Sequence, residues 1–74
     1  MLNAKLRMTK PVWSEEVDDG GIFPSRLSVH EDPDGGRLPF LAVCRNGWGG
    51  GGQARRATLQ EAISYTATLH EKLT

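Results

Sequence analysis

The sequence of 74 residues contains a single cysteine, Cys44, so no disulfide can form within the chain. No stretch approaches the ~20 consecutive apolar residues of a membrane-spanning helix. Residues 1–10 lack the continuous apolar segment of a secretory signal peptide. A single cysteine also suits a reducing compartment. We therefore predict a cytoplasmic protein that does not bind membranes.

Net charge is also absent, because nine Lys and Arg balance nine Asp and Glu. A dedicated nucleic-acid binder usually carries a basic excess, which this chain lacks. The charges are nevertheless distributed unevenly. Most acidic residues lie in the first half of the chain, and the charged residues between Asp34 and Glu61 are all arginines. Such an uneven distribution of charge is typical of a protein that presents a charged patch to a partner. The alternative is that the charges only fill solvated turns.

The sequence has no recognisable catalytic or metal-binding set. Neither His30 nor His70 is placed near Cys44 by the sequence, which disfavours a Cys–His nucleophile. No spacing of His, Cys and acidic residues matches a metal site. Both histidines are expected at the surface or at its boundary. We therefore predict a non-enzymatic protein with no catalytic residue, no metal and no cofactor.

Glycine is abundant in one place only, the run from Gly47 to Gly52, which we expect to be a flexible hairpin loop. The run contains a formal G-x-G-x-x-G pattern. A dinucleotide site requires the helix to open at the last glycine. Here the next helix signal comes six residues later, at Thr58. The pattern therefore does not predict a nucleotide site.

Residues 58–73 predict an amphipathic helix. Thr58 and Glu61 have the spacing of a capping box, in which the Thr hydroxyl accepts from the Glu61 N–H and the carboxylate reaches back. No Gly or Pro interrupts the run that follows. One stripe at helical period contains Leu59, Ala62, Ile63, Thr66, Leu69, His70 and Leu73. Such a helix needs a surface to cover.

The residues before the helix read as short strands and turns. Strand candidates are 12–17, 23–30, 38–45 and, as a provisional last strand, 53–57, and turn signals at 18–21 and 31–36 separate the first three. We predict an α+β fold, a small antiparallel β-meander of three to four strands covered on one face by the C-terminal amphipathic α-helix. Residues 11–74 would form this single β-β-β(-β)-α domain, and residues 1–10 a flexible N-terminal extension.

The core available to this fold is thin. A chain of this length buries only about 60% of its unfolded surface. Domains of this kind often gain stability from a partner or from self-association, so self-association is one of the alternatives for this chain. The predicted core is Val12, Trp13, Val17, Phe23, Leu27, Val29, Phe40, Leu41, Val43, Leu59, Ile63 and Leu69.

The candidate binding residues bracket the glycine run: Arg45, Trp48, Arg55 and Arg56. Trp and Arg dominate protein–protein hot spots, so this loop predicts a partner contact. The same residue types bind single-stranded nucleic acid, with bases stacked on Trp and Arg on phosphates. A structural alternative is that Trp48 folds back over the sheet edge and enlarges the core.

A second candidate contact is acidic and lies at the first predicted strand and turn. It consists of Glu15, Glu16, Asp18 and Asp19. Clustered carboxylates steer association with a basic surface. As solvated turn residues they would need no function.

The segment Thr58-Leu59-Gln60-Glu61-Ala62-Ile63, placed after a hairpin, resembles the T-x-x-E-A helix opening of HicB-like antitoxins over about a third of the chain. That resemblance implies a regulatory subunit paired with a cognate protein. In type, the chain also resembles small phage or mobile-element proteins that disable a host complex, anti-CRISPR proteins among them. We predict a small protein that binds and modulates or inhibits a protein or protein–nucleic-acid complex. The alternatives are a nucleic-acid-binding module and a HicB-like antitoxin.

Overall fold

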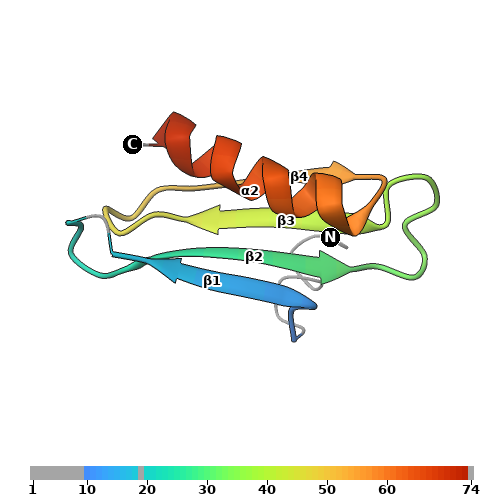
Figure 1. The fold of residues 1–74 in the computed structure, drawn as a ribbon, viewed down its shortest axis with the longest axis horizontal. Helices are drawn as coiled ribbons and strands as arrows, with labels where there is room; N and C mark the ends of the chain where they lie inside the picture. The colour runs from blue at the N-terminus through green and yellow to red at the C-terminus, as the bar shows by residue number, and fades with distance from the viewer. Residues whose placement is uncertain (1–9, 19, 74) are drawn as a thin grey trace.

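The computed structural model describes residues 10–18 and 20–73, and within them four strands and one helix follow one another in the chain. They are β1 (Trp13–Val17), β2 (Ser25–Glu31), β3 (Phe40–Arg45), β4 (Gly51–Arg56) and α2 (Leu59–Leu73). The strands form one antiparallel sheet in sequential order, and α2 lies across one face of it (Figure 1). The predicted α+β meander covered by a C-terminal helix is confirmed, with four strands. The proposed extension falls almost wholly on residues 1–9, outside the described residues.

Proline sets where two of the strands begin. β2 starts at Ser25 rather than at residue 23, directly after Pro24, and β3 starts at Phe40 rather than at residue 38, directly after Pro39. Proline has no N–H to donate to a ladder, so it sits at a strand start or outside the strand. The last strand, in contrast, begins two residues earlier than predicted, because Gly51 and Gly52 join β4.

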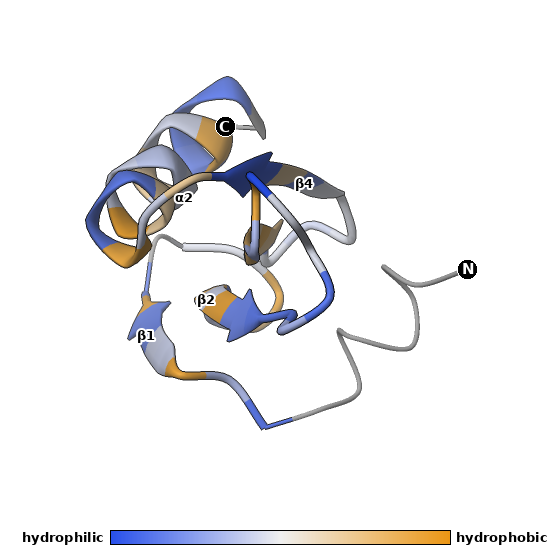
Figure 2. Cartoon of the chain, turned by 90° about the vertical axis from the view of Figure 1, so that its right-hand side faces the viewer, coloured by the Kyte–Doolittle hydropathy of each residue, from blue (hydrophilic) through white to orange (hydrophobic). Residues whose placement is uncertain are grey.

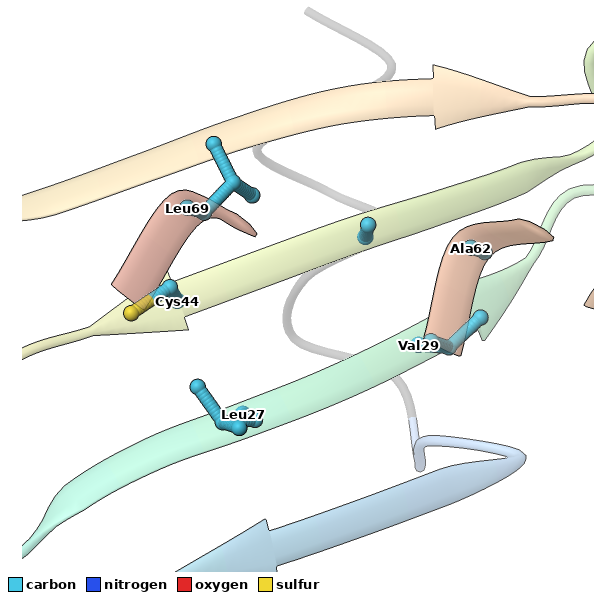
Figure 3. Close-up of a cluster of buried hydrophobic side chains, with 6 residues drawn as sticks. Leu27, Val29, Cys44, Ala62 and Leu69 are labelled. Carbon is cyan, nitrogen blue, oxygen red and sulfur yellow. The ribbon is translucent and has the colours of Figure 1, made fainter. Parts of the chain in front are cut away.

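The main core lies between α2 and the sheet. The register pairs Leu27 with Cys44 and Val29 with Ala42, which places all four on the face that α2 covers. Leu69 and Ala62 of α2 pack onto them, as the close-up in Figure 3 shows. Seen from the side, α2 forms a second layer on that face alone (Figure 2). Alternate residues of β2 and β3 therefore face α2. Partly buried residues around this core are Trp13, Val17, Phe40, Ile63 and Tyr65.

The opposite face of the sheet also carries buried side chains. Leu41 is fully buried and Val43 is 5% exposed, and both alternate with the residues that face α2. His30, the register partner of Leu41, is 4% exposed, with its Nε2 3.2 Å from the Ser28 Oγ. The expectation that His30 lies at the surface was wrong.

The capping box at the start of α2 is confirmed. The Glu61 N–H donates to the Thr58 Oγ1 at 3.1 Å, and the Thr58 hydroxyl donates to the Glu61 carboxylate at 3.1 Å. Ala62, Thr66 and Leu69 of the predicted stripe are buried. The described part of the chain has no helix long and apolar enough to cross a membrane.

Not every predicted core residue is buried. Val12 is 49% exposed, Phe23 46% and Leu59 37%. Val12 and Phe23 lie just outside the strands in which we had placed them, and Leu59 is the first residue of α2. Among the described residues the buried hydrophobic set is Leu27, Val29, Leu41, Ala42, Val43, Cys44, Ala62 and Leu69.

Candidate functional site

Two loops meet at one end of the sheet. The segment between β1 and β2 and the segment between β3 and β4 lie at the same end in Figure 1. The Ile22 N–H donates to the Gly47 carbonyl at 2.8 Å, and the Gly47 N–H donates to the Ser25 Oγ at 3.0 Å. The backbones approach so closely that a Cβ on Gly21 would lie 2.8 Å from the Gly47 Cα. The two loops therefore form one joined structure.

Asn46 organises the second of these loops. Its side chain is buried, and its Oδ1 accepts from the Trp48 N–H at 3.2 Å and from the Gly50 N–H at 2.7 Å. Gly49 turns the chain with φ 96°, a conformation that favours glycine. We expected Gly47–Gly52 to be a flexible loop. The structure instead shows a hydrogen-bonded turn at residues 46–50 that leads directly into β4.

Large apolar side chains project from both loops. Ile22 is 86% exposed, Phe23 46% and Trp48 51%. We call these three residues the loop-end surface. Of them only Trp48 was predicted as a binding residue. Phe23 had been assigned to the core and Ile22 to no site, although Ile22 follows Gly20-Gly21 and precedes Pro24, a context typical of an exposed turn.

A row of charged side chains lies beside this surface, on the face of the sheet away from α2. The register aligns Glu16 with Arg26 and Arg26 with Arg45. The Arg26 Nη2 contacts the Glu16 Oε1 at 2.6 Å. Among the described residues no acidic group lies within ion-pair distance of Arg45. The sequence pointed to Arg45 and Glu16 but not to Arg26, because only the register brings Arg26 to them.

Arg55 and Arg56 lie at the other end of the sheet. Arg55 opposes Leu41, four residues along β3 from Arg45, which is about 14 Å at ~3.4 Å per residue. Its Nη2 contacts Asp32 Oδ2 at 3.2 Å, and its Nη1 donates to the Leu38 carbonyl at 3.2 Å. Arg56 is on the opposite face.

The Arg56 guanidinium lies 3.7 Å from the centre of the Tyr65 ring, in a cation–π contact. Its Nη1 also donates to the Arg55 carbonyl at 2.6 Å. The four predicted binding residues on either side of the glycine run therefore do not form one surface. Arg45 ends β3 and Trp48 lies in the loop that follows it, while Arg55 and Arg56 make their contacts elsewhere.

The predicted acidic contact is also divided. Glu15 and Glu16 are successive residues of β1 and therefore lie on opposite faces of the sheet. Glu16 belongs to the charged row, and Glu15 is exposed. The Asp18 Oδ1 accepts from the Gly20 N–H at 3.5 Å within the first loop. Asp19 lies outside the described residues.

Within residues 10–18 and 20–73, no group of three or more His, Cys, Asp or Glu side chains gathers in a way that could hold a metal ion. Comparison of the chain with protein-family models, with curated proteins and with solved structures finds no match. The loop-end surface groups exposed apolar side chains on two joined loops, and the charged row lies beside it.

Proposed function

We propose that this chain is a non-enzymatic protein that binds another protein, alone or in a complex with nucleic acid, through the loop-end surface. The observation that carries the proposal is the exposure of Ile22, Phe23 and Trp48 on two joined loops. Exposed apolar side chains that lie together, rather than singly, are typical of interaction sites. A chain of this size acts on a larger complex by covering part of its surface, so we propose modulation or inhibition as the result of binding.

The rigidity of the loops supports the same proposal. Asn46 and Ser25 hold the backbone of the second loop through side-chain hydrogen bonds. A side chain presented from a fixed backbone loses less conformational entropy on binding than one on a mobile loop. Trp and Arg are also the side chains most enriched in interface hot spots. Trp48 and Arg45 therefore suit the centre of a contact.

Direct binding to single-stranded nucleic acid is the second candidate. Trp48 and Phe23 offer exposed rings for stacking, and Arg45 offers a cation. The support is weaker because Arg55 and Arg56, the other two cations in that hypothesis, contact Asp32 and Tyr65 instead. The salt dependence of binding separates the two functions, since affinity for nucleic acid falls steeply with salt.

The test is affinity capture from host lysate with the wild-type chain and with the double variant Ile22→Ser/Trp48→Ser, each with and without nuclease. The matched control is Leu38→Ser, because Leu38 is 44% exposed but lies in the β2–β3 connection at the other end of the sheet. We expect a protein that is captured despite nuclease, retained by the control and lost with the double variant. Equal capture by all three chains would contradict the proposal. Capture that disappears with nuclease would favour nucleic acid.

A further inference from the structure

A groove of about 310 Å³ lies beside the loop-end surface. Phe23 and Pro24 supply its apolar lining, and Arg26 and Arg45 supply a cationic one; Glu16 completes it. The residues come from β1, β2, β3 and the loop before β2, so the groove exists only in the folded sheet. It combines the two kinds of chemistry that recognise an acidic residue next to an apolar one.

The positive charges in this groove are not fully balanced by carboxylates. Glu16 is already paired with Arg26 at 2.6 Å. Arg45 lies directly opposite Arg26 in the register, and like charges in that position repel each other. Arg45 is exposed, and no acidic partner for it exists among the described residues. The groove thus holds one guanidinium whose charge no neighbouring carboxylate balances.

We propose that this groove receives a carboxylate side chain, an Asp or Glu, of the protein partner, with a neighbouring apolar residue of that partner against Phe23 and Pro24. The inference rests on the proposed function and names the chemistry of the partner. A guanidinium binds a carboxylate through two parallel hydrogen bonds, which makes Arg45 a specific receptor rather than a simple point charge. Neutralising Arg45 also relieves its repulsion from Arg26.

A protein carboxylate fits this groove better than a nucleic-acid backbone does. Binding to nucleic acid draws its affinity from several phosphates contacted together. Among the described residues that line the groove, only Arg45 lacks a carboxylate partner, and Glu16 would repel the next phosphate along a strand. The adjacent Ile22 and Trp48 are apolar and exposed, as in the centre of a protein interface.

The experiment is selection of displayed random short peptides on the full chain, followed by affinity measurement of the selected peptides. The variants are Arg45→Gln, Arg45→Glu and the matched control Arg37→Gln, an exposed arginine between β2 and β3 at the other end of the sheet. The wild-type chain and the control should select peptides with Asp or Glu beside an apolar residue. Arg45→Gln should bind those peptides about tenfold more weakly or worse. Arg45→Glu should select Lys or Arg instead. No variant should lower the thermal midpoint, because both Arg45 substitutions remove the repulsion from Arg26.

Several outcomes would overturn the inference: no selected peptide, no acidic enrichment, or the same enrichment on Arg45→Gln. If the capture experiment still shows loss with Ile22→Ser/Trp48→Ser, the proposed function stands and only the partner chemistry is wrong. If the substitutions change neither the capture from lysate nor the peptide selection, the proposed function and the partner chemistry are both wrong. The last measurement is the binding of a labelled single-stranded oligonucleotide to the chain at several salt concentrations. Tight binding that collapses between about 50 and 200 mM salt would assign the groove to phosphate and overturn the carboxylate.

Discussion

Gly47 offers the sharpest test of the loop contact on which the binding surface depends. A Cβ at Gly47 would collide with the carbonyl oxygen of Phe23, and that atom belongs to the backbone, so no side-chain rotation relieves the collision. We predict that Gly47→Ala separates the two loops. Gly47 does not have a positive φ, so the expected effect comes from the contact and not from backbone strain.

The magnitude follows from what the substitution disturbs. Forcing an extra methyl into a close contact costs about 1–3 kcal/mol. The displacement also weakens the hydrogen bonds from Ile22 to Gly47 and from Gly47 to Ser25, at about 1 kcal/mol each. A total near 3–5 kcal/mol lowers the thermal midpoint by at least about 12 °C in a domain of this size. Binding through Ile22 and Trp48 should weaken as well, because their relative positions change.

The assay is thermal unfolding by circular dichroism, with Gly51→Ala as the matched control. Gly51 lies on β4, has no positive φ, and its added Cβ would meet only the Cys44 carbonyl at 3.3 Å. The alanine reduces the entropy of the unfolded chain, worth about 0.5–1 kcal/mol, while the Cys44 carbonyl must shift by a few tenths of an ångström, so the net change should be much smaller than that of Gly47→Ala. A Gly47→Ala midpoint equal to that of the wild type would refute the described loop contact. Equal losses in both variants would attribute the effect to glycine replacement in general.

Two further predictions concern stability. Thr58→Ala should lower the free energy of unfolding by about 1 kcal/mol, because the Glu61 N–H loses its acceptor, while Thr58→Asp should retain most of the stability of the wild type. Chemical denaturation measures the free energy of unfolding of both variants. Equal stabilities of the two variants would contradict the capping role. A double-mutant cycle between Asp32→Asn and Arg55→Met should give a coupling of about 1–2 kcal/mol, since these side chains are only 12% and 22% exposed. The same cycle on the exposed Glu16–Arg26 pair should give less than about 1 kcal/mol, and reversal of that order would show that burial does not control these pairs.

Local signals explain what could be predicted from the sequence. The cap at Thr58, the uninterrupted stripe behind it and the alternation in 25–30 each depend on residues a few positions apart. Turn chemistry at Asp18–Gly21 and Glu31–Gly36 then separated the strands, although Glu31 itself belongs to β2. The errors at the strand starts came from giving Phe23 and Leu38 to strands although Pro24 and Pro39 follow them.

Contacts between residues far apart in the sequence explain what could not be predicted from it. The bond between Gly47 and Ser25 joins residues 22 positions apart, and nothing in the glycine run indicates it. Arg26 and Arg45 become neighbours only through the register of β2 with β3, and a slip of one residue would move Arg26 to another partner. Likewise, the sequence placed Arg55 and Arg56 beside Trp48, but their partners, Asp32 and Tyr65, lie elsewhere in the chain.

Cys44 gives the molecule an internal reporter of its own unfolding. Its side chain is fully buried on β3, beneath α2, and it is the only sulfhydryl in the chain. A thiol-reactive dye can reach the sulfur only when helix and sheet come apart, so the labelling rate reports the free energy of that opening. Movements of the two joined loops that leave the core closed would not be detected at this atom. Labelling with and without a bound partner would therefore distinguish a partner that stabilises the whole fold from one that orders the loops alone.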